Sequence, residues 1–195
     1  MRRAGKDFRF HGNMLNCKAT EKAAARKEGV RWMRLFIAVK LSDEIRKALA
    51  KIQEDLRRQG VQGRYLTPEN LHMTLAFIGE VPDPDPVLEA ADAVPFPAFP
   101  ITLKEAGIFK SNILWAGIRP SEPLEKLVKH LRRELAEADI PFDRQTFRPH
   151  ITLIRGLDTE KGLPEIRLPE VTMTVDHMTV YRSDRGRDGM IYTEI

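Results

Sequence analysis

The pattern His-x-Thr-Leu occurs twice in this chain, at residues 72–75 and again 78 positions later at 150–153. Successive side chains of an extended strand point to opposite faces, so the histidine and the threonine of each copy share one face. The other face of the first copy carries apolar side chains: Leu71, Met73, Leu75 and Phe77. Each copy therefore predicts a strand with an apolar face on a core and an imidazole beside a hydroxyl on its open face.

The segments before the two motifs also match. In each half an apolar strand leads to a serine that suits a helix N-cap, and apolar residues then recur at helical spacing. The histidine follows 30 residues after Ser42 in the first half and 29 residues after Ser121 in the second. Repetition of strand, capped helix and motif at matching spacing indicates an internal duplication.

The fold class predicted from this pattern is α+β, with two similar lobes. The motif strands, near 71–78 and 147–155, should face each other across a central cleft. Further elements are predicted as strands at 101–109 and 171–181, a last edge at 190–193, and one short helix at 87–93 within the proline-rich stretch 82–100.

The basic character of the chain resides in its first 32 residues. They hold nine basic and three acidic side chains, a net charge of +6 within a total of +4, which leaves −2 for the rest. Residues 1–32 are expected to be a disordered or optional extension, and Met33 to begin the folded domain of residues 33–195. The alternatives for the extension are a basic tail that touches RNA, an amphipathic transit peptide, and a gene-boundary artefact that precedes a working start at Met33.

Composition points to a cytoplasmic protein. No apolar run approaches the roughly 18 to 20 residues that a membrane span needs, and no secretory signal is visible. The single cysteine, Cys17, cannot form an internal disulfide, which agrees with a reducing compartment. No protein partner is implied, and we expect a monomer.

Two imidazoles on opposite sides of a bound group suit in-line displacement at phosphorus. Imidazole titrates near about pH 6.5, so His72 and His150 can divide the work of acid and base. The residues alone leave open which histidine is the acid. Thr74 and Thr152 can donate hydroxyl hydrogen bonds to the non-bridging phosphate oxygens.

Two arginines near the second motif are candidates for phosphate binding. Arg155 lies at an odd separation from His150, so ideal alternation puts it on the opposite face unless a bulge near Gly156 turns it. Arg148 lies on the histidine face and is the substitute.

Other histidines and aromatics have weaker claims to a site. His130 is expected on the exposed surface of a helix, and His177 lies in a predicted strand that has no matching second copy. His11 lies in the extension. One aromatic near the cleft is expected to stack on a nucleobase, and the candidates are Tyr65, Phe109, Trp115 and Phe147.

Three segments resemble one known family: residues 33–38 (MRLFIA), 65–79 (YLTPENLHMTLAFIG) and 147–155 (FRPHITLIR). They are similar to the RNA 2′,3′-cyclic phosphodiesterases, also called 2′-5′ RNA ligases, of the two-histidine phosphoesterase superfamily. The likeness extends over residues 33–193, and two such motifs are far more specific than one. The sequence departs from the family's pattern at Tyr65, where tryptophan is common, and in a shorter C-terminus.

The resemblance implies a bilobal fold of two antiparallel sheets facing the central cleft, with helices on the outside. It also implies an enzyme without metal or other cofactor that hydrolyses an RNA-terminal 2′,3′-cyclic phosphate to a 2′-phosphate. It assigns His72 as the proton donor to the leaving 3′-oxygen and His150 as the proton acceptor from water. Reversible 2′-5′ ligation would use the same site. The rival interpretations are an enzyme for small cyclic nucleotides or 2′-5′ oligonucleotides, a non-catalytic RNA-end binding protein, and, as a poor fourth, a zinc enzyme.

Overall fold

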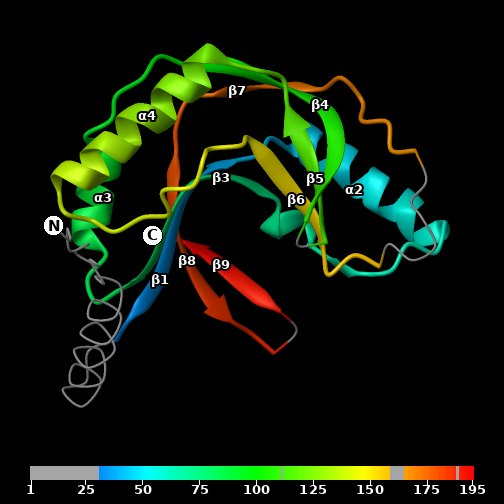
Figure 1. Ribbon diagram of the computed structural model, residues 1–195, viewed down its shortest axis with the longest axis horizontal. Helices are drawn as coiled ribbons and strands as arrows, with labels where there is room; N and C mark the ends of the chain where they lie inside the picture. The colour runs from blue at the N-terminus through cyan, green and yellow to red at the C-terminus, as the bar shows by residue number, and fades with distance from the viewer. Residues whose placement is uncertain (1–30, 111, 159–164, 188) are drawn as a thin grey trace, which may run out of the picture. The chain divides into compact units, whose positions relative to one another are not determined.

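The computed structural model describes residues 31–110, 112–158, 165–187 and 189–195. Residues 33–195 form a compact unit of their own (Figure 1). The prediction for the basic extension falls outside the described residues, apart from positions 31 and 32. Within the described ranges, no helix is long and apolar enough to cross a membrane.

The described elements follow the predicted alternation of strands and helices. The strands are β1 (Met33–Lys40), β2 (Arg64–Tyr65), β3 (His72–Val81), β4 (Phe99–Phe109), β5 (Ile113–Ile118), β6 (His150–Arg155), β7 (Thr172–Val175), β8 (Thr179–Arg185) and β9 (Met190–Glu194). The helices are α2 (Asp43–Arg58), α3 (Asp85–Asp92) and α4 (Glu122–Glu137), with a 3-10 turn, η1 (Pro68–Asn70).

Both predicted helix caps are confirmed. The hydroxyl of Ser42 accepts a hydrogen bond from the backbone N–H of Ile45 at 3.3 Å, and Ser121 accepts one from Leu124 at 3.4 Å. Each bond satisfies a donor that the first helical turn leaves without an intrahelical partner. The short helix predicted in the proline-rich stretch is α3, and the predicted last edge is β9.

The strands form one antiparallel path that curls, in the order β7-β4-β5-β6-β3-β1-β8-β9, with β2 beside β6 (Figure 1). The expectation of two separate sheets is therefore corrected. The two groups of strands meet where β3 runs antiparallel to β6, through the residue pair Met73 and Ile151. The motif strands thus lie next to each other at the centre of the path.

The strand predicted at 171–181 is wrong, because this segment forms two strands with different partners. Pairing of β7 with β4 sets Met173 opposite Ile101, whereas pairing of β8 with β1 sets Val180 opposite Ile37. The chain changes partner between Val175 and Thr179, and the apolar alternation shifts phase in the same stretch, between Val175 and Met178.

Each motif strand contacts a helix from the other half of the chain. The buried side chain of Gln53 on α2 donates its amide to the carbonyls of Leu66 and Leu153, both at 2.9 Å, which ties α2 to β6. Helix α4 packs against α3 and β3. The two halves therefore interleave, while the placement of the helices on the outside and the internal duplication stay predictions.

Candidate active site

The two motif histidines begin neighbouring strands and share one face of the sheet. Because Met73 pairs with Ile151 in antiparallel register, the flanking positions bring His72 toward Thr152 and Thr74 toward His150. These four side chains are half-buried, whereas Met73 and Ile151 between them are fully buried. His72 and His150 are diagonal neighbours in this register, and on a regular ladder such residues lie roughly 7–8 Å apart. This separation leaves room for a phosphate group between the two imidazoles.

A register shift follows the threonine in both motif strands. On β3, Leu75 is the extra residue between Thr74 and Ala76, and on β6 Leu153 is the extra residue between Thr152 and Ile154. A bulge of this kind inverts the alternation of side chains beyond it. Ala76 and Ile154, directly after the bulges, therefore stay buried, and the next residues, Phe77 and Arg155, come to the histidine face.

The bulge on β3 corrects the prediction for Phe77. This side chain does not line the main core; it packs with Phe36, Ala38, Tyr181 and Tyr192, the cluster that surrounds His72. The bulge on β6 has the same consequence for Arg155, which turns toward the site. It occurs at Leu153, three residues before the position at Gly156 that the sequence suggested.

His72 is held on one side by the backbone and on the other by aromatic rings. Its Nδ1 lies 2.8 Å from the carbonyl oxygen of Asn70, and its ring centroid lies 4.7 Å from that of Phe36 and 5.1 Å from Tyr192, which meets it edge-on. Burial lowers the pKa of His72 from 6.5 to about 4, although the bond to the carbonyl opposes the shift. The positive charges of Arg155 and His150 lower this pKa further.

His150 has the same arrangement in the second motif. Its Nδ1 lies 2.7 Å from the carbonyl oxygen of Arg148, two residues earlier, and the ring of Phe109 meets it edge-on at 4.9 Å. Burial is the main cause that lowers the pKa of His150, and the charge of Arg155 adds to it against the opposing carbonyl bond. One arginine thus acts electrostatically on both histidines.

The carbonyl bonds fix the tautomer of both imidazoles. A carbonyl oxygen can only accept, so Nδ1 of each ring carries the proton and Nε2 is free for proton transfer. A neutral ring in this state is a base at Nε2, and the ring becomes an acid when a proton is added there. A bound phosphodiester anion favours the charged imidazolium and so opposes the effect of burial on the pKa.

Three hollows surround the two histidines. Thr74, Arg148 and His150 line a hollow of about 920 Å³, His72 lines a smaller one of about 240 Å³, and Arg155 lines a third of about 860 Å³. Thr152 is half-buried on β6 between His150 and the bulge. The charge of Arg155 acts on both imidazoles and so links these hollows, and the chemical roles of the predicted site residues stay predictions.

The four candidate aromatics differ in position. Tyr65 donates its hydroxyl to the carbonyl of Val61 at 2.8 Å and lies under the guanidinium of Arg57, which turns it away from the histidines. Trp115 fills the space above Gly107, where an added Cβ would meet its ring at 2.3 Å. Phe109 and Phe147 both line the hollow of His150, and a stacking role for either of them stays a prediction.

The other histidines pair with acids away from the site. Nε2 of His130 lies 3.3 Å from Glu134 and Nδ1 of His177 lies 2.6 Å from Asp176. His11 lies outside the described residues. In the part of the chain that the structure describes, no three His, Cys, Asp or Glu side chains gather as metal ligands would, and the predicted independence of metal stays a prediction.

Sequence reasoning missed several groups that shape the site. The carbonyls of Asn70 and Arg148 are backbone atoms and carry no sequence signal beyond their position two residues before each histidine. Tyr192 reaches His72 from β9, a strand 120 residues away along the chain. Arg64 lies directly opposite Arg155 across β2 and β6, a relationship that depends on strand register.

Comparison of the sequence with known proteins identifies the family of this chain. Residues 36–187 match the family model of the 2′-5′ RNA ligase superfamily. An RNA 2′,3′-cyclic phosphodiesterase of Thermotoga maritima is 34% identical over 173 residues, covering 82% of this chain and 91% of that protein. The Escherichia coli protein of the same name is 32% identical over 166 residues, covering 83% of this chain and 93% of the relative.

Solved structures agree with the sequence comparison. The crystal structure of Escherichia coli LigT complexed with 3′-AMP superposes with a TM-score of 0.71 at 30% identity, covering 84% of this chain and 95% of LigT. The apo form of LigT gives a TM-score of 0.70 at 29% identity, with the same coverage. The curled antiparallel sheet with its three described helices is thus the LigT fold.

Proposed function

Because the chain belongs to the 2′-5′ RNA ligase superfamily, we propose that it hydrolyses the 2′,3′-cyclic phosphate at an RNA terminus to a 2′-phosphate. The observation that carries this proposal is the matched pair of imidazoles. His72 and His150 lie on one face of neighbouring strands, and each has its Nδ1 bound to the carbonyl two residues earlier. Two Nε2 atoms are thereby presented for proton transfer at one centre.

The proposed reaction is an in-line displacement without a covalent enzyme intermediate. His150 accepts a proton from water at Nε2 while the water oxygen bonds to phosphorus. The bond from phosphorus to the 3′-oxygen breaks, and His72 donates its Nε2 proton to that oxygen. The products are a 2′-phosphomonoester and a 3′-hydroxyl, and proton exchange with solvent restores both histidines.

The remaining candidates stabilise the charge that develops on phosphate. The hydroxyls of Thr74 and Thr152 lie one pleat from the histidines and can donate to the non-bridging oxygens. Arg155 supplies positive charge next to both imidazoles, and Arg148 lines the hollow of His150. Charge-assisted hydrogen bonds from guanidinium to phosphate are stronger than neutral ones, so these arginines should contribute to substrate binding.

In this proposal, binding of the substrate causes His72 to take up the proton that it later donates. Both histidines have lowered pKa values in the free protein, so both imidazole rings are largely neutral at neutral pH before the substrate binds. An anionic phosphodiester between the rings raises the pKa of each, and one proton then resides at His72. A 5′-hydroxyl in place of water would complete the 2′-5′ ligation that the sequence suggested.

The matching environments of the two motifs also support the predicted duplication. Each has a histidine at the start of a strand, a carbonyl bond two residues back, and a bulge directly after the threonine. We expect the enzyme to act on RNA as a monomer in the cytoplasm.

The test is incubation with an oligonucleotide ending in a 2′,3′-cyclic phosphate, followed by identification of the product. The expected product is a 2′-phosphate, and His72→Ala and His150→Ala should not form it at a comparable rate. Binding of the cyclic end without turnover would favour the RNA-end binding protein. Turnover restricted to small cyclic nucleotides or 2′-5′ oligonucleotides would favour the related phosphoesterase.

A further inference from the structure

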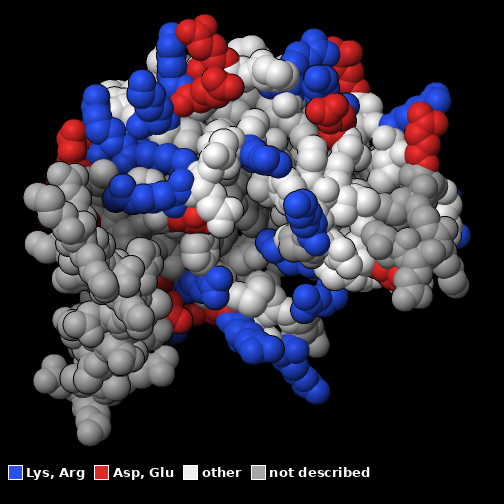
Figure 2. Space-filling model, viewed as in Figure 1, with Lys and Arg blue, Asp and Glu red and all other residues white. Residues whose placement is uncertain are grey.

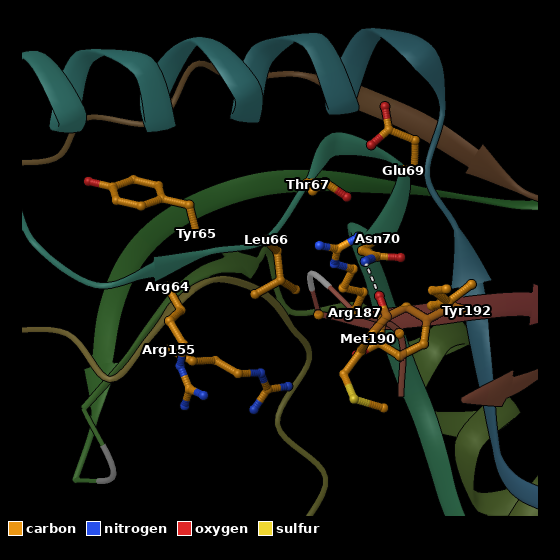
Figure 3. A pocket seen from close by; sticks show the side chains of 13 residues that line it. Arg64, Tyr65, Leu66, Thr67, Glu69, Asn70, Arg155, Arg187, Met190 and Tyr192 are labelled. Atoms are coloured by element: carbon orange, nitrogen blue, oxygen red, sulfur yellow. Dashed lines mark hydrogen bonds between the residues drawn. The ribbon is translucent and has the colours of Figure 1, made fainter. Parts of the chain in front are cut away.

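Two arginines face each other on the rim of the 860 Å³ hollow. Antiparallel pairing of β2 with β6 sets Arg64 directly opposite Arg155, and both are exposed. Like charges in directly opposed positions destabilise a strand pair. Among the described residues, no carboxylate forms an ion pair with either of them. Figure 3 shows both side chains extending side by side along the same end of this hollow.

The opposite wall of the hollow is the β8–β9 hairpin. It contributes Arg187, which no described carboxylate neutralises, together with Met190 and Ile191, which are 38% and 55% exposed. The side-chain amide of Asn70 donates to the carbonyl of Met190 at 2.8 Å and so joins the hairpin to the segment before His72 (Figure 3). Positive charge and accessible apolar side chains therefore occur together on this wall.

The charge balance of the hollow favours an anionic ligand. Glu69 is the one acidic side chain among the described residues that line it, against three arginines. Basic side chains also predominate on the face of the molecule that carries the hairpin (Figure 2). Grooves that combine cations with aromatic side chains are typical of single-stranded nucleic acid binding, and the ring of Tyr192 lines this hollow.

The hollow opens directly beside His72. Asn70 and Tyr192 line it, and these are the residues whose carbonyl and ring contact the His72 imidazole. In the proposed mechanism His72 protonates the 3′-oxygen, so the terminal ribose lies on this side of the phosphate. The nucleotides 5′ of that ribose must leave the site from the same side.

We propose that this hollow binds the RNA strand immediately 5′ of the terminal nucleotide, with Arg64 and Arg187 as the residues that recognise its phosphates. Arg64 acts together with Arg155, and the exposed side chains of Met190 and Ile191 contact a base. This assignment rests on the proposed function and makes the enzyme selective for oligonucleotides over mononucleotides.

The hollow on the His150 side is the alternative path, and two of the four cations that line it contact neighbouring groups. Arg132 donates to the carbonyl of Gln145 at 2.9 Å, and the guanidinium of Arg144 lies 5.2 Å from the centre of the Phe142 ring. Lys110 and Arg144 line this hollow, so their alanine variants test the alternative path and are matched to the Arg64 and Arg187 variants. Arg119, which pairs with Glu170 at 2.7 Å, serves as a control for the loss of one positive charge.

The experiment compares kcat/KM for a hexanucleotide ending in 2′,3′-cyclic phosphate with kcat/KM for a nucleoside 2′,3′-cyclic phosphate. Arg64→Ala and Arg187→Ala should each lower the ratio of the two values about tenfold, as expected for loss of one charge-assisted phosphate contact. The slope of log kcat/KM against log salt concentration for the hexanucleotide should become shallower by about 0.7 per variant. Arg119→Ala should leave both the ratio and the slope unchanged.

An unchanged ratio in Arg64→Ala and Arg187→Ala would overturn the strand assignment, as would a fall confined to Lys110→Ala and Arg144→Ala. Fluorescence anisotropy of a labelled hexanucleotide carrying the 2′-phosphate measures the same contacts without turnover. If the unaltered protein hydrolyses neither substrate, the proposed function fails. Weaker binding of the labelled strand to Arg64→Ala and Arg187→Ala would then still support the strand site, and equal binding would contradict it.

Discussion

The Nδ1–H of His72 donates to the backbone carbonyl of Asn70 at 2.8 Å, and this bond presents Nε2 of a buried ring to the site. Burial lowers the pKa of His72 to about 4. The folded domain therefore holds this ring in its neutral form over most of the acidic range. The proton that the mechanism requires must be added when the substrate binds.

The lowered pKa of His72 predicts a specific loss of stability in acid. The unfolded chain takes up this proton near pH 6.5 and the folded domain only near pH 4, so stability from this group is complete above pH 6.5 and falls as the pH drops through that window. The size of the effect is about 3 kcal/mol. The measurement is the free energy of unfolding in urea at about pH 7 and at about pH 4, on either side of this window.

The control for this prediction is His72→Asn, whose amide can still donate to the Asn70 carbonyl but cannot be protonated. The variant should lose less stability than the unaltered protein as the pH falls, because the carboxylates titrate equally in both. Identical pH dependence of the two proteins would show that His72 is not held neutral by burial.

The two lowered pKa values also predict different pH profiles for kcat/KM and kcat. The dependence of kcat/KM on pH reports on the free protein, so its bell-shaped maximum should lie below pH 6.5. The dependence of kcat reports on the complex, in which the phosphodiester anion raises both pKa values, so its maximum should lie at higher pH. Coincident maxima, or a kcat/KM maximum on the alkaline side, would contradict this account.

Gln53 is predicted to support the bulge that turns Arg155 toward the site. Its amide donates to the carbonyl of Leu153, the extra residue of that bulge, and to the carbonyl of Leu66. Gln53→Met leaves both carbonyls without this donor, so it should destabilise the domain by about 1–3 kcal/mol and lower kcat/KM. Gln59→Met, at the exposed end of the same helix, is the control and should change stability by less than about 0.5 kcal/mol. Loss of stability without any change in kcat/KM would show that Gln53 stabilises the fold but does not support the geometry of the site.

Activity is predicted to persist after treatment with a strong chelator. Both proton transfers are assigned to imidazoles, and the developing charge is assigned to threonine hydroxyls and arginines. Turnover measured before and after chelation should therefore agree. Abolition by chelator with recovery on addition of one divalent metal would remove the proposed mechanism.

Much of the fold could be predicted because local signals and tertiary packing agree. Ser42 and Ser121 cap the helices that their spacing indicated, and the apolar positions predicted after them are buried except Ile52, which is half-buried. The motif strands begin at the two histidines, with the threonine on the same face. These features depend on residues close together in the chain, where periodicity and capping act directly.

The parts that could not be predicted depend on register between distant strands. A simple period of two places Phe77 on the core face and Arg155 away from the histidines, and bulges at Leu75 and Leu153 reverse both placements. The apolar alternation within 171–181 shifts phase between Val175 and Met178, and the two parts pair with β4 and β1, partners that depend on the register of the whole sheet. The opposition of Arg64 and Arg155 follows from the same kind of non-local pairing.

The division of labour between the histidines is tested most directly with a cyclic substrate that carries sulfur in place of the leaving 3′-oxygen. On the oxygen substrate, His72→Ala and His150→Ala should each lower kcat by about 10² to 10⁴-fold. A thiolate barely needs protonation to leave, so the sulfur substrate should restore His72→Ala to within about tenfold of the unaltered enzyme while His150→Ala stays low. Rescue of His150→Ala in place of His72→Ala would exchange the two roles. Turnover of the oxygen substrate that is unchanged in either variant would contradict the two-histidine mechanism itself.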